Sequence, residues 1–154
     1  MFHFVAVWKD DKGMQVVNYA REWVGKIPYN SPGSGSYCVV SELTSTDCSG
    51  FVCGVYLYFD VNLWPKKGEI RNSPLVTNIG TTDYNQAKPG DIIWWKETKT
   101  GLGDGHVAIY AGDGYMIEET SGGHDGVYGN VMVSLVSRIA NSRPVSGIFR
   151  VFND

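Results

Sequence analysis

The stretch "GHVAIYAGDGYMIEE", residues 105–119, predicts a β-hairpin. Two runs rich in β-branched and aromatic residues, 105–112 and 115–120, flank a Gly-Asp-Gly turn. Three more runs of this kind are separated by Gly-rich turns, at 91–95, 131–136 and 146–152. Because these runs are short and closely spaced, they predict an antiparallel sheet in the C-terminal half.

The N-terminal half predicts helices instead. From Met14 to Val24 the apolar residues recur at helical spacing, and Gly25 stands where a C-terminal cap would lie. A second helix is expected to begin at Asp47 and to end before Pro65. Helices followed by an antiparallel sheet make an α+β domain.

The remaining segments predict connections. We expect one domain over residues 1–154, in which 1–12 is an N-terminal strand or arm that ends in a turn at 10–13. Residues 27–46 begin with clustered Pro, Gly and Ser and predict a long loop. Residues 60–90 contain scattered Pro and are expected to form turns and one short helix.

Composition argues against several classes of partner. Thirteen basic and sixteen acidic side chains give a net charge of −3, and no basic run could follow a nucleic-acid backbone. The longest apolar run, 51–59, is far shorter than the roughly 20 residues that span a membrane. We therefore expect a soluble protein, and we expect it to be a monomer. The N-terminus has no signal-peptide pattern, so we expect synthesis in the host cytoplasm without classical export.

Cysteine usage indicates at least one free thiol. Cys38, Cys48 and Cys53 are an odd number, and their spacing fits neither a disulfide framework nor, with the three histidines, a zinc site. We therefore expect no metal and no cofactor. Cys53 should lie on a different helix face from Cys48 and be buried.

Cys48, in "TDCSGFV" at 46–52, is a candidate nucleophile. Asp47 is a good N-cap whose carboxylate could accept the N–H of Gly50, which makes Cys48 the first helical residue. The free N–H groups and the dipole of a helix start favour a thiolate, and small Ser49 and Gly50 leave room for a substrate and an oxyanion hole. Taken alone, however, a cysteine ahead of an apolar helix is more often a buried structural residue.

A nucleophilic cysteine needs a base, and His106 is the best placed of the histidines. It follows a Gly-rich turn at the start of a predicted strand, so the fold would have to bring it to Cys48. A lone histidine on a strand is at least as often a structural residue. Asp104 could tune the site, although an exposed turn carboxylate is its simpler interpretation.

Four motifs in order resemble the NlpC-type cell-wall peptidases, which are papain-like cysteine hydrolases. They are the hairpin above, "PYNSPG" at 28–33, "DCSGFV" at 47–52 and "KPGDIIWW" at 88–95. The resemblance covers about residues 14–120. It implies a papain-like fold in which the catalytic cysteine begins a helix that packs on an antiparallel sheet.

The resemblance also implies roles for individual residues. Cys48 matches the nucleophile and His106 the general base, and Tyr29 matches the tyrosine of a Pro-Tyr pair near the active site. Ser49 and Asp47 are expected beside the oxyanion and substrate. Of the pair at 94–95, one tryptophan should face the core, and we expect Trp95 to line a substrate groove.

The third polar residue departs from the family, which most often has a histidine twelve positions after the base. That position is Glu118, and a carboxylate could accept the second ring N–H of His106. A three-residue loop at 112–114 would place Glu118 on the face of His106, whereas a two-residue turn would present Glu119. His124 is an outside candidate.

The implied function is hydrolysis of an amide bond in the stem peptide of peptidoglycan by acyl transfer. A CHAP-like N-acetylmuramoyl-L-alanine amidase and an inactive wall-binding module are the alternatives, and protein-directed acyl transfer is a weaker one. We expect a phage-type lytic enzyme, released by lysis or carried on a virion. The loop at 27–46 is longer than the family usually has, and it carries Cys38.

Overall fold

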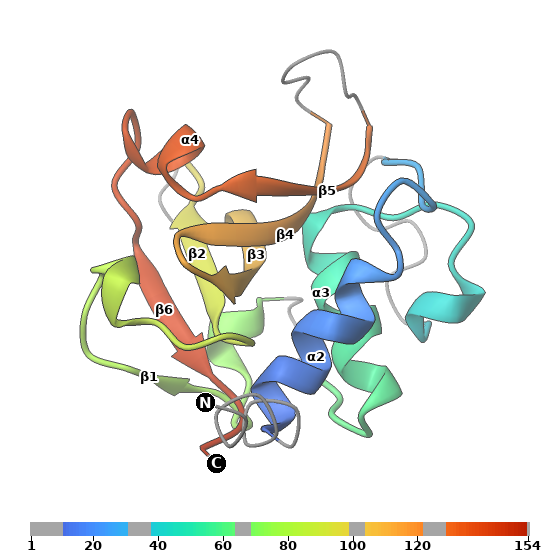
Figure 1. The fold of residues 1–154 in the computed structure, drawn as a ribbon, viewed down its shortest axis with the longest axis horizontal. Helices are drawn as coiled ribbons and strands as arrows, with labels where there is room; N and C mark the ends of the chain where they lie inside the picture. Colours follow the sequence, from blue (N-terminus) through green and yellow to red (C-terminus); the bar gives the residue numbers. More distant parts are fainter. Residues whose placement is uncertain (1–10, 31–37, 64–68, 99–103, 122–128, 154) are drawn as a thin grey trace, which may run out of the picture.

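The computed structural model describes residues 11–30, 38–63, 69–98, 104–121 and 129–153. A six-stranded antiparallel sheet has the order β1-β6-β2-β3-β4-β5 (Figure 1). The strands are β1 Thr77–Asn78, β2 Ile92–Lys96, β3 Asp104–Gly112, β4 Tyr115–Thr120, β5 Asn130–Leu135 and β6 Gly147–Arg150. The helices are α2 Lys12–Arg21, α3 Cys48–Tyr58 and α4 Ser137–Ala140, with 3-10 turns at Val40–Glu42, Ile70–Asn72 and Tyr84–Gln86. The predicted α+β class is confirmed.

Helix α2 begins earlier than the sequence pattern predicted. Asp11 caps it by accepting the N–H groups of Gly13 at 2.7 Å and Met14 at 3.3 Å. The turn expected at 10–13 is therefore wrong for Lys12 and Gly13, because a capping carboxylate in this position starts a helix. The helix ends at Arg21, and Gly25 follows with a φ of +77°.

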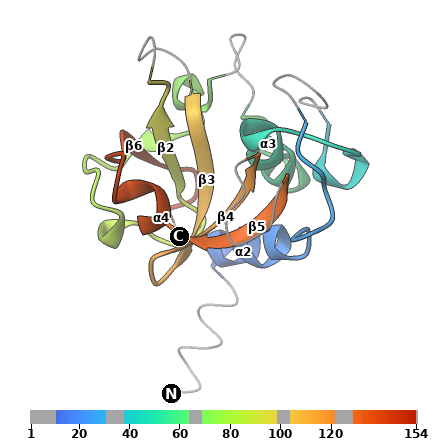
Figure 2. The same cartoon turned by 90° about the horizontal axis from the view of Figure 1, so that it is seen from above.

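Two cores cover the two faces of the sheet. Helices α2 and α3 pack on one face, and α4 lies beyond the other (Figures 1 and 2). Helix α3 is buried from Gly50 to Tyr56, which explains why it is apolar on every side. The second core lies on the other face of the sheet, on the side of α4, and contains Ile93, Trp95, Ala108, Tyr110, Met116, Val136, Val145 and Ile148.

The "KPGD" motif joins α2 to the sheet. A Cβ atom on Gly13 would lie 2.2 Å from the carbonyl oxygen of Pro89, and one on Gly90 would lie 2.7 Å from Gly13 Cα. Only glycine at both positions permits this approach. Asp91 then pairs with Arg150 of β6 through two contacts of 2.9 and 2.7 Å. The motif is thus a structural junction in this protein.

The β3–β4 hairpin combines a two-residue turn with a bulge. Asp113 and Gly114 have φ of +53° and +83°, as a type I′ turn requires. The register then shifts between Tyr110 and Gly112, so that Ile109 pairs with Ile117. The extra residue restores the register that a three-residue loop would have produced.

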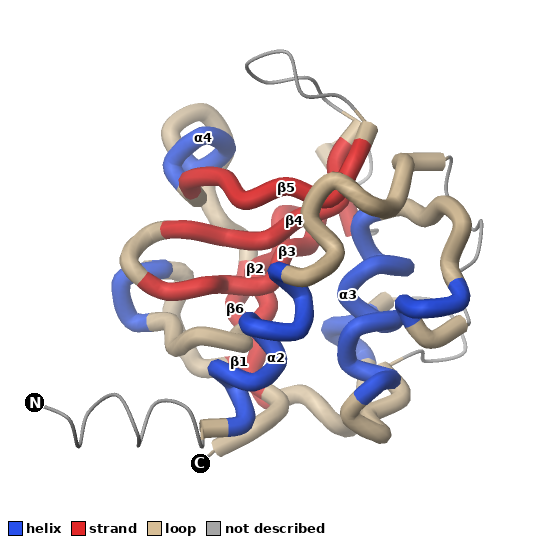
Figure 3. Tube along the Cα trace, turned by 45° about the vertical axis from the view of Figure 1, so that its right-hand side comes forward, coloured by secondary structure: helices blue, strands red, loops and turns tan. Residues whose placement is uncertain are grey.

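Other predicted segments differ in detail or lie outside the described residues. The described part of residues 60–90 contains two 3-10 turns where turns and one short helix were predicted, and it also contains the short strand β1, which the pattern did not predict (Figure 3). The N-terminal arm up to residue 10, the loop 31–37 and His124 lie outside the described ranges. Within those ranges, no helix combines the length and apolar character needed to cross a membrane.

Candidate active site

Asp47 caps α3 in the predicted way. Its Oδ1 accepts the N–H of Gly50 at 2.8 Å and the hydroxyl of Ser49 at 3.3 Å. Asp47 is buried, with only 6% of its surface exposed. Cys48 is consequently the first residue of α3 and is half-buried. The N–H groups that open a helix have no acceptor inside it, so this end can face a ligand that carries negative charge.

Gly50 packs tightly against the residue before the cap. A Cβ atom here would lie 2.0 Å from Thr46 Oγ1, and Thr46 is completely buried. Packing against Thr46 therefore requires glycine at this position. Ser49 is half-buried, and it is the small residue that remains beside Cys48 on the accessible side.

The cap should contribute measurably to stability. Replacing Asp47 with alanine is expected to lower the free energy of unfolding by about 1–2 kcal/mol, because the Gly50 N–H loses its acceptor. Asp47→Asn should lose at most a few tenths of a kcal/mol, since an amide oxygen can still accept. Urea denaturation at pH 7 measures both. Equal losses in the two variants would show that the charge, not the cap, is what stabilises.

His106 projects from β3 and meets both candidate partners. Its Nε2 lies 2.7 Å from Glu118 Oε1, and its ring also hydrogen-bonds the side chain of Cys48. Since Nε2 is engaged by Glu118, Nδ1 is the nitrogen available to the sulfur. The imidazole side chain is 11% exposed and lies against the indole of Trp95, with ring centroids 5.8 Å apart.

The electrostatics favour a charged His106. Burial lowers the pKa of His106, but the hydrogen bonds to Cys48 and Glu118 outweigh it and raise that pKa to about 9. Burial likewise raises the pKa of Glu118, yet its hydrogen bond to His106 and the charge of His106 prevail, and this pKa falls to about 2. At neutral pH the pair is an imidazolium and a carboxylate.

Two residues that the sequence reasoning missed bind the other oxygen of Glu118. The Ser134 hydroxyl and the Arg138 guanidinium both donate to Glu118 Oε2. Ser134 pairs with Met116 in the β4–β5 register, which puts it on the same face as Glu118. Only the strand register could have indicated this contact.

Glu119 occupies the opposite face of β4 and does not touch His106. It has no exposed surface, and neither carboxylate oxygen has a hydrogen-bond partner. Burial, and secondarily the charge of Asp47, raises the pKa of Glu119 to about 8. Glu119 is therefore an uncharged acid at neutral pH, near the start of α3.

Tyr29 lies on the same side of the molecule as the start of α3. Its backbone forms a bridge with Thr46, and its N–H donates to the carbonyl of Gly129 at 2.7 Å. Burial, followed by proximity to Cys48 and Asp47, raises the pKa of the Tyr29 phenol. This is the neighbourhood that the sequence predicted for Tyr29.

Trp95 does not line a groove, so its predicted place must be corrected. It is 1% exposed, and its indole N–H donates to the carbonyl of Arg143 at 3.1 Å. The register pairs Trp95 with His106, so both side chains face the second core, which covers this side of the sheet. Trp94 points to the other face and carries the guanidinium of Arg71, 4.6 Å from the ring centroid.

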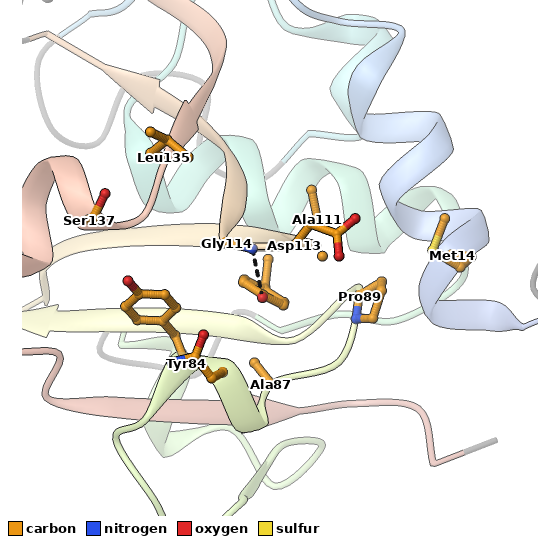
Figure 4. A pocket seen from close by; sticks show the side chains of 12 residues that line it. Met14, Tyr84, Ala87, Pro89, Ala111, Asp113, Gly114, Leu135 and Ser137 are labelled. Atoms are coloured by element: carbon orange, nitrogen blue, oxygen red, sulfur yellow. Dashed lines mark hydrogen bonds between the residues drawn. The ribbon is translucent and has the colours of Figure 1, made fainter.

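A cavity of about 800 Å³ lies at the opposite end of β3 from His106, around the hairpin turn (Figure 4). Its lining residues are Met14, Tyr84, Asn85, Ala87, Pro89, Tyr110, Ala111, Gly112, Asp113, Gly114, Leu135 and Ser137. They include no nucleophile with an adjacent base, so the chemistry belongs to the other end of the strand. Among the described residues, no cluster of three His, Cys, Asp or Glu side chains could hold a metal ion.

Known proteins share this sequence pattern and fold. A probable endopeptidase p60 from Listeria welshimeri is 32% identical over 89 residues, 56% of this chain and 16% of that protein. The chain thus spans about a sixth of that relative's length. The NlpC/p60 domain of the peptidoglycan hydrolase SagA is 25% identical, with a TM-score of 0.60 and coverage of 90% of this chain and 97% of that one.

A third relative shares the fold alone. RipD from Mycobacterium tuberculosis, described as a non-catalytic NlpC/p60 domain protein adapted to peptidoglycan binding, is 22% identical. Its TM-score is 0.61, and the match covers 91% of this chain and 98% of that one. The model of the NlpC/P60 family matches residues 22–139. The chain belongs to the NlpC/P60 family.

Proposed function

We propose that this protein is a cysteine peptidase that hydrolyses an amide bond in the stem peptide of bacterial peptidoglycan. The observation that carries the proposal is the contact of Cys48, at the start of α3, with His106, which in turn binds Glu118. A nucleophile, a base and a residue that orients the base are the parts that acyl transfer needs. The wall substrate is suggested by the similarity to SagA, a peptidoglycan hydrolase, and the peptidase reaction by the similarity to the probable endopeptidase p60.

In the first half-reaction, the Cys48 thiolate attacks the amide carbonyl carbon. The N–H groups of Cys48 and Ser49 donate to the resulting oxyanion. The N–H of Gly50 is not used, because it already donates to Asp47. The His106 imidazolium gives its proton to the amide nitrogen as the C–N bond breaks. The amine leaves, and an acyl group remains on the sulfur as a thioester.

In the second half-reaction, water releases the acyl group. Neutral His106 takes a proton from water while the water oxygen attacks the thioester carbonyl, and the sulfur departs as a thiolate. This step restores the imidazolium and the thiolate. Glu118 keeps Nε2–H of His106 hydrogen-bonded throughout, which leaves Nδ1 directed at the sulfur and the water.

Mass spectrometry of wall fragments tests the proposal. Purified peptidoglycan is incubated with the protein and with Cys48→Ala, and Cys38→Ser serves as the matched control because it alters a different half-buried thiol. New amino termini within stem peptides, produced by the parent protein and Cys38→Ser alone, support a peptidase. Free lactyl groups would indicate the amidase instead, and binding to walls without any cleavage would indicate a wall-binding module.

The pH dependence should follow His106. Because His106 must hold a proton to release the amine, kcat/KM is expected to fall above a pH of about 9, the pKa of this residue. Glu118→Gln removes the charge and weakens a hydrogen bond that raise that pKa, so the alkaline fall should begin at lower pH. Initial rates on a soluble muropeptide between pH 6 and 10 measure the shift. An unchanged alkaline limb in Glu118→Gln would contradict the assigned coupling.

A further inference from the structure

Glu118 is held from a second side by the segment that follows β4. Its Oε1 binds His106, whereas its Oε2 accepts from Ser134 on β5 and from Arg138 on α4. The Glu118 side chain has no exposed surface, and that of Arg138 is 17% exposed. All these contacts therefore form away from bulk water, where the loss of one partner is costly.

A carboxylate in this position needs such donors. If only Oε1 were bound, a buried oxygen would remain without a partner, and the side chain could rotate either oxygen toward His106. The guanidinium also supplies a positive charge beside the second oxygen of this buried carboxylate, so that Glu118 is paired on both sides.

We propose that Arg138, assisted by Ser134, is a positioning residue for the reaction: it holds the Glu118 carboxylate so that Oε1 faces Nε2 of His106. Arg138 donates to Glu118 Oε2 and acts on the site through that carboxylate. Its effect on hydrolysis rests on the proposed function. Its effect on the reactivity of Cys48 does not, because a thiol can be alkylated without a wall substrate.

A double-mutant cycle tests the proposal through that reactivity. The rate of Cys48 alkylation by iodoacetamide at pH 7 is measured for Arg138→Met, Glu118→Gln, the double variant and the parent protein. Peptide mass spectrometry separates Cys48 from the half-buried Cys38 and the buried Cys53. Arg138→Met should slow alkylation about tenfold relative to the parent protein. The same substitution added to Glu118→Gln should slow it less than about twofold relative to Glu118→Gln alone. On an active protein, kcat should show the same pattern, with KM little changed.

Two further variants separate positioning from general stability. Arg138→Lys keeps a cation that can donate and should recover most of the lost rate. Arg150→Met removes another partly buried arginine, which pairs with the buried carboxylate of Asp91 at the end of β2 opposite Trp95, and it should leave alkylation unchanged. Equal slowing by Arg138→Met in both backgrounds, or no slowing in either, would overturn the proposal. If the parent protein does not cleave walls, the proposed function is overturned, but the alkylation rates still test the role of Arg138.

Discussion

Replacing Cys48 with serine is expected to lower kcat for stem-peptide hydrolysis by at least about 10³-fold. In the parent protein His106 already holds a proton near neutral pH, since its pKa is about 9. That arrangement suits a thiolate, which needs no base when it attacks. A serine hydroxyl remains protonated near neutral pH and would need a neutral imidazole, so the same geometry no longer supplies the required proton acceptor.

Kinetics on a soluble muropeptide at pH 7 measure this loss. Cys48→Ala provides the baseline without a nucleophile, and the melting temperature of each variant confirms that it is folded. His106→Ala should also lose activity, by about 10²–10⁴-fold, because the leaving amine is no longer protonated. A serine variant that retained a tenth of the parent activity would contradict a thiolate mechanism.

Glu119→Gln is expected to remove a pH-dependent loss of stability. The pKa of Glu119 is about 8 in the folded protein, against a reference of 4.5. Between these values the folded protein keeps a proton that the unfolded chain has released, so the stability of the parent falls as pH rises through this window. Each pH unit is worth about 1.4 kcal/mol, which allows a total of up to about 4 kcal/mol.

Urea denaturation of the parent and Glu119→Gln at pH 5, 7 and 8.5 isolates this contribution. The variant should gain stability relative to the parent at each step, whatever its stability at pH 5. Glu118→Gln is the control with the opposite sign, because the pKa of Glu118 is lowered to about 2 and its contribution is lost only as the solution becomes acidic. A difference between parent and Glu119→Gln that stayed constant with pH would contradict the buried, unpartnered state of Glu119.

Local signals in the sequence account for the placement of Cys48 and His106 in the candidate site. The position of Cys48 follows from Asp47, because a capping carboxylate and the N–H it binds are only three residues apart. The strand that carries His106 follows from the run of β-branched and aromatic residues along 105–112 and the Gly-rich turns on either side. Such features depend on neighbours in the chain, and the structure contains both.

The partner of His106 depended on one bulge. The turn has two residues, which without the register shift next to Tyr110 would have presented Glu119. A bulge changes the face of every residue beyond it, and nothing in the letters of the hairpin distinguishes it from a longer loop. The burial of Trp95 was missed for a related reason, since which face of a strand is covered depends on what packs there.

The sequence alone was sufficient for the class of fold, the family motifs, and the placement of Cys48 at a helix start and His106 on a strand, because capping and periodicity act over a few residues. Tertiary structure decided which carboxylate meets His106, that Ser134 and Arg138 hold it, and that Trp95 and Glu119 are buried. These outcomes depend on the register between strands and on packing between segments far apart in the chain. Their energies come from contacts that do not exist until the sheet has formed.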